Sequence, residues 1–568
     1  MGRKREIWVV LGVMLVGIWG IAGLWKVAGL PTSHDSIAHM ARMYAYAEGL
    51  KDGIFPVLWA RRMFWGIGSP VLMLNYQMPY YFAMVWHGIG LNFDDSFKTV
   101  LSLSHILSGI LMYWTLRSRY KTLPSLLGAI LYLLSPYRFL NIYVRAAMGE
   151  VVAAMFPPII LAGLWRRSFT LQTIGWAGLF LSHPVGSALY SGIFLGYTVL
   201  ASGLRDIGNT LKKFFLPYLL ALMIAAFNIL PTLALTKYTY YSPANSNTLR
   251  NFPTLRQLVY SPWGYGFSTE DNQDQMSFQV GIIQWLLAGM TLGIIVWKRK
   301  ENKETWELKY YTFVFVVAIS LMLQKIATPV YIHLGMGKII DYPWRILMIF
   351  SFIAAVCAPQ IMKLMKTKAM QIGLAVLLIS GAIYTNRNHI RINLVWPWPS
   401  DSFQHGTGDA YGEYAARSRE THEGSEFYDL AEFTAGEGKI QVVKDISNET
   451  IIVIEANQTS IVRLNMMYFP GWKVRINGEN VGVDVTKSPT STSSQCFVTR
   501  RVAKHIDDSG LIACHVKEGT TEIEAKYEAL PVQRSGNLIT LSGIGILLWQ
   551  IFRSFYRPTT NVKRLSKT

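Results

Sequence analysis

Long apolar segments recur along the chain, and clusters of lysine and arginine follow every second one. The apolar segments cover residues 7–29, 96–116, 123–137, 150–165, 214–235, 278–297, 310–323, 346–362, 369–384 and 538–552. Between 165 and 214, two further apolar segments are joined by a turn at residues 183–184. A hydrocarbon core of roughly 30 Å needs about 20 helical residues at 1.5 Å each. The pattern predicts a mainly α, polytopic membrane protein with about twelve transmembrane helices.

The cationic clusters give this protein a predicted orientation. They follow Leu116, Trp165, Trp297 and Met362, and short cytoplasmic loops are enriched in lysine and arginine. We therefore expect a multi-pass protein of the plasma membrane with both termini in the cytoplasm. The loops 31–95, 236–277 and 324–345 then face outward. Within the first loop, residues 75–90 are weakly apolar, and we expect them to form a helix lying in the outer interface.

The composition changes between residues 386 and 535. Short alternating runs such as KIQVVKDI, TIIVIEA, KVRINGENVGV and LIACHV are separated by turn residues, including Asn477-Gly478. This alternation is typical of antiparallel strands in a sandwich. The predicted organisation is a transmembrane domain over 1–385, an extracytoplasmic β-sandwich over 386–535, and a last helix with a basic cytoplasmic tail over 536–568.

Composition narrows the class of protein. The 568 residues are 51% hydrophobic and 16% charged, with a formal net charge of +19. That excess suggests a nucleic-acid partner, but the cations lie in short loops beside apolar segments, where they orient helices and contact anionic lipid. We therefore expect no nucleic acid. Cys357 lies in a predicted helix, whereas Cys496 and Cys514 lie in the β-domain, either as a disulfide or as two free thiols.

Two lone carboxylates lie on the predicted outer side. Asp35 falls in the first turn of a helix predicted over 33–49, an amphipathic interfacial helix on which His39 shares its face. Glu150 opens a returning helix. Each is also explained as an ordinary acid at a helix start. Because carboxylates are costly among long apolar stretches, their occurrence at one membrane face favours a functional site.

Outer cations and aromatic residues accompany these acids. Arg345 begins a late helix on the outer side, against the positive-inside trend, and Arg145, Arg61, Arg62 and Lys338 are also outside. They are either snorkelling anchors or a phosphate site suited to the arginine fork. Most aromatic side chains suit an interfacial belt. A few in the loops could stack on a sugar, namely Trp59, Trp65, Tyr76 and Trp263.

Several motifs resemble the GT-C superfamily of membrane glycosyltransferases, and more closely the YfhO-like group, part of which carries the label "6-pyruvoyl-tetrahydropterin synthase-related". They are SHDSIAHMARMYAYAEGLKDGIFPVLW, GIGSPVLMLNYQMPYYF, SPYRFLNIYVRAAMGE, DYPWRIL, YFPGWKVRINGENV and ALPVQRSGNLITLSG. The match spans most of the chain and is diffuse in the middle helices. It implies an inverting glycosyltransferase that moves a sugar from a polyprenyl-phosphate donor to an extracytoplasmic glycan, lipid or protein of the cell envelope.

The resemblance also assigns roles to residues. Asp35 matches the first-loop acid that serves as catalytic base or orients the acceptor, and Glu150 matches a second catalytic acid. Arg345 and Arg145 would bind the donor phosphate, and His34, His39, Tyr76 and Tyr342 would line the substrate pocket. No tightly bound cofactor is expected. A divalent cation is left open, with Asp35 and Glu150 as its ligands, because His34 stands where some relatives have a second acid.

Two other classes of function compete with this one. A transporter or flippase for lipid or lipid-linked sugar usually has charges at the membrane midplane or related half-repeats. An envelope scaffold would act through its β-domain alone. The charges at the outer rim and the motif matches favour the enzyme.

Overall fold

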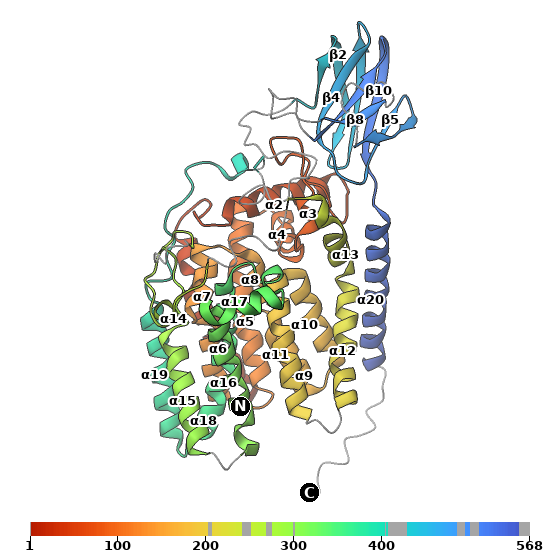
Figure 1. The fold of residues 1–568 in the computed structure, drawn as a ribbon. Coiled ribbons are helices and arrows are strands. Elements are labelled where there is room, and N and C mark those ends of the chain that lie inside the picture. Colours follow the sequence, from red (N-terminus) through yellow and green to blue (C-terminus); the bar gives the residue numbers. More distant parts are fainter. Residues whose placement is uncertain are drawn as a thin grey trace.

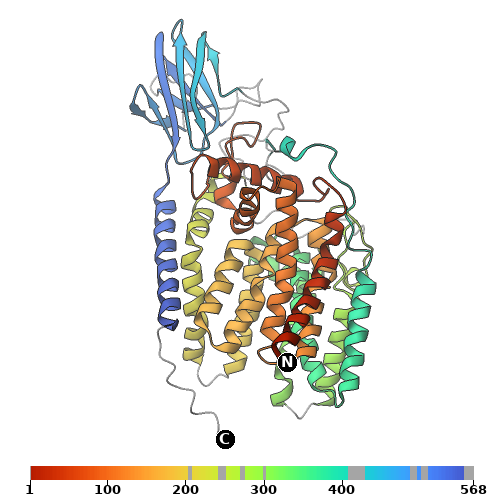
Figure 2. The same cartoon turned by 180° about the vertical axis from the view of Figure 1, so that it is seen from behind.

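The computed structural model describes residues 2–202, 207–240, 251–268, 275–298, 302–403, 405–406, 429–485, 495–499 and 510–555. A bundle of helices forms one body, and a β-domain lies at one end of it (Figures 1 and 2). The first helix begins and the last helix ends at the other end of the bundle. We refer below to the β-domain end and the opposite end.

The N-terminal half is helical. Its elements are α1 (Gly2–Ile21), η1 (Ala22–Trp25), α2 (Ser36–Lys51), α3 (Val71–Leu74), α4 (Met78–Gly88), α5 (Phe93–Leu116), α6 (Thr122–Leu133), α7 (Pro136–Phe139), the π-helical turn η2 (Leu140–Val144), α8 (Met148–Ala153), α9 (Phe156–Arg166), α10 (Phe169–Ser182), α11 (Pro184–Ser202), α12 (Ile207–Ile224), α13 (Ala226–Leu235) and η4 (Thr236–Tyr238).

The second half of the bundle continues to residue 403 and resumes at 531. It comprises α14 (Leu255–Val259), α15 (Ile282–Trp297), α16 (Asn302–Met322), α17 (Gln324–His333), η5 (Met336–Lys338), η6 (Pro343–Leu347), α18 (Met348–Lys363), α19 (Lys368–Asn386), η7 (Ser400–Phe403) and α20 (Pro531–Phe555). The predicted loop 324–345 is largely helical, because it contains α17, η5 and the start of η6. The helices α16 and α17 meet at a bend of 88°.

Among the described residues, seven helices are long and apolar enough to cross a membrane, or up to ten if each bent pair is one span. These helices indicate a membrane protein. The count of twelve crossings and the orientation of the termini stay predictions. The basic tail predicted after Arg553 lies outside the described residues from position 556 onward.

The β-domain contains two five-stranded sheets. The strands of the first sheet follow the order β1 (Ala431–Ala435), β4 (Ser460–Met467), β9 (Leu511–Val516), β8 (Cys496–Val498) and β7 (Val483–Asp484). The strands of the second sheet follow the order β2 (Gly438–Ile446), β3 (Glu449–Ala456), β10 (Gly519–Tyr527), β5 (Trp472–Ile476) and β6 (Glu479–Val481). Every pairing is antiparallel except β7 with β8. The predicted strands are therefore present; the sandwich packing of the two sheets stays a prediction. Cys496 and Cys514 pair across β8 and β9 and form a disulfide.

The β-domain is held to the loop 31–95 by specific contacts. Asp445 accepts a hydrogen bond of 3.0 Å from Nε of Arg61, and Asp52 accepts one of 2.8 Å from the Ser447 backbone N–H. Trp59 is 2% exposed and packs among Phe469, Trp472 and Tyr527. The prediction that Trp59 stacks on a sugar is wrong, because its ring fills this interdomain aromatic cluster.

Helix α2 also differs from the prediction. We expected an amphipathic interfacial helix over 33–49, but α2 begins at Ser36 and buries side chains around most of its circumference, including His39, Arg42 and Tyr46. It contacts α4, α5 and η7. These elements cover the faces that an interfacial helix would leave to lipid and water, so α2 is a packed part of the β-domain end.

Candidate active site

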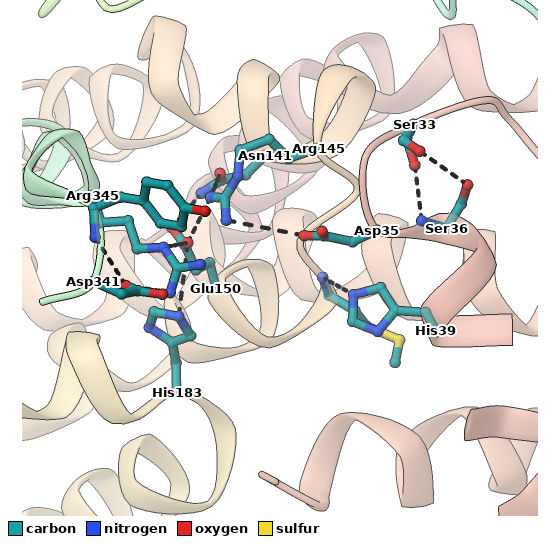
Figure 3. A network of polar contacts seen from close by, with 12 residues as sticks. Ser33, Asp35, Ser36, His39, Asn141, Arg145, Glu150, His183, Asp341 and Arg345 are labelled. Atoms are coloured by element: carbon teal, nitrogen blue, oxygen red, sulfur yellow. Dashed lines mark hydrogen bonds and ion pairs between the residues drawn. The ribbon is translucent and has the colours of Figure 1, made fainter. Parts of the chain in front are cut away.

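The predicted acids and arginines converge from three parts of the chain (Figure 3). Asp35 precedes α2, Arg145 and Glu150 flank the start of α8, and Arg345 lies in η6. His183, at the turn between α10 and α11, completes the group, with its Nε2 3.7 Å from a Glu150 oxygen. The loop before α2 is joined to this group by its backbone, since Asp35 N–H donates to the Arg145 carbonyl at 3.0 Å.

Asp35 occupies the N-cap position of α2 without capping it. Its side chain makes no capping hydrogen bond; instead, the Ser36 backbone N–H donates to Ser33 Oγ at 3.2 Å. The Asp35 carboxylate lies 4.0 Å from the Arg145 guanidinium, and its side chain is 41% exposed. The alternative that Asp35 is merely a helix cap is therefore not supported, and the carboxylate is accessible beside a cation.

Glu150 is almost completely buried and fully engaged. Its Oε1 lies 2.6 Å from Arg145 Nη1, and its side chain is 2% exposed. Its Oε2 accepts hydrogen bonds from Tyr137 Oη at 2.8 Å and from Asn141 Nδ2 at 2.9 Å. A carboxylate held by three donors and closed to water is poorly placed to exchange a proton with substrate. The geometry makes Glu150 the counter-ion that fixes Arg145, and the prediction of Glu150 as a catalytic acid does not fit it.

Arg345 has an unused hydrogen-bond donor. Its Nη1 lies 3.0 Å from Asp341, whose side chain is 36% exposed. Its Nε is buried and has no hydrogen-bond partner, because the nearest carboxylate oxygen, of Glu150, is 3.9 Å away. A buried donor without a partner is costly. Arg345 therefore offers an N–H that an anionic ligand could satisfy.

An irregular segment brings Arg145 and Glu150 together. Residues five apart on a regular helix point in different directions. Here the π-helical turn η2 ends at Val144, and Ala146 has a φ of +52°, in the left-handed region that a residue with a Cβ seldom adopts. The reversal at Ala146 turns Glu150 back onto Arg145. Local strain of this kind is concentrated at functional sites.

The predicted pocket residues separate into two groups. His34 lies at the edge of the site, with Nε2 3.0 Å from the Gly266 carbonyl and its ring stacked on Phe267, and burial lowers its pKa. Tyr342 lies beside the Arg345 guanidinium, 5.4 Å from its ring centroid. His34 therefore joins the site to residues 265–267 of the loop 236–277.

His39 and Tyr76 both contact Tyr80, but His39 is buried whereas Tyr76 is partly exposed. His39 is 3% exposed, and its Nδ1 lies 2.9 Å from Tyr80 Oη. Burial lowers the pKa of His39 to about 3. The Tyr76 ring is stacked on Tyr80 at 5.9 Å, and burial raises the pKa of its hydroxyl. His39 packs α2 against α4 through Tyr80, so it supports the site from behind and does not line an open pocket. Tyr76 also contacts the site, since its ring centroid lies 6.3 Å from that of His183.

Sequence reasoning missed five residues of this cluster: Tyr137, Asn141, His183, Asp341 and Trp344. The Trp344 ring lies 4.7 Å from the Arg145 guanidinium. Four of the five fall within the motifs SPYRFLNIYVRAAMGE and DYPWRIL. Asn141 is a polar residue four positions before Arg145 in an apolar stretch, and this contrast is a signal that the sequence offers. Asp341 has no comparable signal.

No group of three or more His, Cys, Asp or Glu side chains suited to a metal ion occurs in the described part of the chain. Arg145 contacts both Asp35 and Glu150, the two ligands that the sequence suggested for a divalent cation. A cation between those carboxylates would have to displace a guanidinium that Glu150 holds at 2.6 Å. The arrangement therefore does not favour that metal site.

Comparisons with known proteins give limited information. No family model matches the chain, and no curated protein is significantly similar to it. Among solved structures, it is similar to the oligosaccharyltransferase of Archaeoglobus fulgidus in the apo form, with 11% identity and a TM-score of 0.42. The match covers 71% of this chain and 56% of the oligosaccharyltransferase. A likeness of this degree does not establish a shared activity, and membership of the YfhO-like group stays a prediction.

Proposed function

We propose that this protein is an inverting membrane glycosyltransferase of GT-C type that uses a polyprenyl-phosphate sugar as donor. The observation that carries the proposal is the pair formed by Asp35 and Arg145: an accessible carboxylate 4.0 Å from a buried guanidinium. A base beside a fixed positive charge is what displacement of an anionic leaving group requires. The motif resemblance supplies the identity of the donor.

In this mechanism Asp35 is the general base. The acceptor hydroxyl attacks the anomeric carbon of the sugar while its proton passes to the Asp35 carboxylate. The bond between the anomeric carbon and the phosphate oxygen breaks, and its electron pair remains on the lipid phosphate. Attack opposite to the leaving group inverts the anomeric centre. One general base contributes about 10²–10⁴-fold, so alignment of donor and acceptor supplies much of the remaining acceleration.

The two arginines have different tasks. Arg145 is immobilised by Glu150, Asn141 and Tyr137, so its charge is already oriented before the reaction begins. The Nε of Arg345 has no hydrogen-bond partner, and its Nη1 forms an ion pair with the partly exposed Asp341. We expect the donor phosphate to bind Arg345 and to replace Asp341, which can turn to solvent. Glu150 is then a positioning residue.

The test is transfer from a radiolabelled polyprenyl-phosphate sugar by the purified full-length protein. Asp35→Asn should lower turnover by about 10²–10⁴-fold with little change in donor KM. The matched control is Asp95→Asn, which removes an acid near the start of α5 whose partner is Asn92; it should retain full activity. Equal turnover by the wild-type and Asp35→Asn proteins would refute the proposal.

A second pair of variants tests the phosphate site. Arg345→Lys keeps the charge but loses the fork, and should raise donor KM more than it lowers kcat. Asp341→Asn removes the competitor for the phosphate and should lower donor KM. If Asp341→Asn raised donor KM instead, the expected exchange of Asp341 for phosphate would be wrong. Transport of labelled lipid by proteoliposomes without sugar transfer, insensitive to Asp35→Asn, would favour a transporter.

A further inference from the structure

A large cavity lies at the opposite end of the bundle. Its volume is about 1120 Å³, and it is enclosed by the ends of α9, α11 and α18, the starts of α10, α12 and α16, and the turn after α5. These helix ends lie away from the β-domain in Figure 1. The cavity is therefore distinct from the cluster around Asp35.

The cavity is strongly cationic. Six basic side chains line it: Arg119, Arg167, Lys212, Lys213, Lys298 and Lys363. Among the described lining residues, Glu307 is the one carboxylate, and it is already occupied. Its Oε1 lies 2.8 Å from Arg119 and accepts a hydrogen bond of 2.5 Å from Tyr197 Oη. Arg167, Lys212, Lys213 and Lys363 therefore face a space in which the described lining residues carry little compensating negative charge.

The wall of the cavity is ordered and partly aromatic. Trp165 donates to Tyr197 Oη at 2.8 Å, and the Arg119 guanidinium stacks over the Trp165 ring at 4.2 Å. Trp306 lies 5.3 Å from Tyr197, measured between ring centroids. The ion pair and the aromatic rings thus form a packed floor, whereas Arg167, Lys212, Lys213 and Lys363 are exposed at the rim.

The rim continues onto an apolar surface. Leu216 lines the cavity and is 56% exposed, and the adjacent Phe215 and Leu219 on α12 are 38% and 52% exposed. In a membrane this face of α12 would contact acyl chains. A ligand with an anionic head and an apolar tail would therefore place its head among the cations and its tail along α12.

We propose that this cavity binds the phosphorylated headgroup of an anionic lipid. Arg and Lys are the side chains that bind phosphate oxygens, arginine through its planar fork and lysine as a point charge. Several cations at one membrane face attract anionic lipid in any case, but a cavity of this size with a fixed floor adds selectivity for a headgroup that enters it. The proposal does not depend on glycosyl transfer.

The experiment uses the full-length protein, purified in a neutral detergent, and native mass spectrometry to count bound lipids during titration. The probes are phosphatidic acid and phosphatidylcholine, with glycerol 3-phosphate as soluble competitor. Phosphatidic acid should bind at one saturable site, at least about tenfold more tightly than phosphatidylcholine. Glycerol 3-phosphate should compete only at far higher concentration, because it lacks the tail.

Two triple variants with equal loss of charge separate the cavity from the general surface. Arg167→Gln/Lys212→Gln/Lys213→Gln removes three rim cations and should weaken phosphatidic acid binding at least about tenfold. Lys121→Gln/Lys366→Gln/Lys368→Gln removes three exposed cations of the same end that do not line the cavity, and should change binding less than about twofold. Equal losses in both variants, equal affinity for phosphatidylcholine, or equal binding of glycerol 3-phosphate would each overturn the proposal.

Discussion

The two ends of the helix bundle differ in how their charged side chains are paired and buried. At the β-domain end, Arg145 is held by Glu150 at 2.6 Å and Arg345 by Asp341 at 3.0 Å, and the Arg145 and Glu150 side chains are 4% and 2% exposed. At the opposite end, six cations surround a cavity of about 1120 Å³ with one acid among the described lining residues. The first end pairs its charges within the protein, whereas the second pairs Arg119 with Glu307 and leaves Arg167, Lys212, Lys213 and Lys363 exposed to a ligand.

This difference has an energetic meaning. A buried ion pair gains stability only when both partners are present, because either one alone is a buried, uncompensated charge. Exposed cations of like sign contribute little to folding and repel one another weakly. Substitutions at the β-domain end should therefore change stability strongly, whereas those around the rim should mainly change ligand binding. Four substitution experiments test this difference between the two ends.

The largest effect is expected for Glu150→Gln. The substitution removes the carboxylate 2.6 Å from the buried Arg145 guanidinium and leaves it the 41%-exposed Asp35 carboxylate at 4.0 Å. It should lower the free energy of unfolding by about 3–5 kcal/mol. Denaturation in mixed micelles measures it. The double variant Glu150→Gln/Arg145→Gln should recover part of the loss, since no unpaired charge remains. Equal stability of Glu150→Gln and the wild type would contradict the counter-ion role.

Acid should destabilise the protein through His39. Burial lowers the pKa of His39 from 6.5 to about 3 in the folded state, so below pH 6.5 the unfolded chain binds a proton that the folded chain does not. The free energy of unfolding should therefore fall by about 1.4 kcal/mol per pH unit from 6.5 toward 3. In the His39→Gln variant, the free energy of unfolding should depend less steeply on pH between pH 6 and 4.5, by about 1.4 kcal/mol per pH unit. Identical slopes in the two proteins would show that His39 is solvated.

Glu307→Gln should have an intermediate effect at the opposite end. Glu307 binds Arg119 and Tyr197, but the Arg119 side chain is 39% exposed and can be hydrated when the carboxylate is removed. We expect a loss of about 1–2 kcal/mol in the free energy of unfolding. Stability measurements beside Glu150→Gln compare the two ends directly. A loss as large as that of Glu150→Gln would remove the distinction between them.

The smallest effect is expected for Lys212→Gln. Lys212 is exposed at the rim of the cavity, so its removal should change the free energy of unfolding by no more than about 0.5 kcal/mol, toward higher stability because neighbouring cations repel it. The melting temperature in a lipid-free detergent reports the change. A clear loss of stability there would indicate a structural partner for Lys212.

The sequence was sufficient to identify the charged groups but not their pairing. Asp35, Arg145, Glu150 and Arg345 stand out because charges are costly among apolar segments. The contact between Arg145 and Glu150 depends on the π-helical turn and on Ala146, neither of which has a sequence signal. A regular helix would have separated the two side chains, and the pair therefore required the structure.

The opposite end shows the same limit at longer range. The sequence indicated basic clusters in loops between helices, as the positive-inside trend leads one to expect. It gave no sign that Arg119, Lys212 and Lys363, from three separate helix ends, share one cavity. Strands were easier to anticipate, because alternation marks each one locally: the runs KIQVVKDI and TIIVIEA became β2 and β3.

The anchoring of the first loop to the β-domain bears on how the protein is made. Arg61 and its partner Asp445 are separated by 384 positions. At about 5–20 residues per second, a ribosome takes roughly 20–80 s to cover that distance. During this interval the segment that carries Asp35 has emerged without the strands that will fix it. The β-domain end of the bundle therefore matures last, and only in chains translated past Asp445.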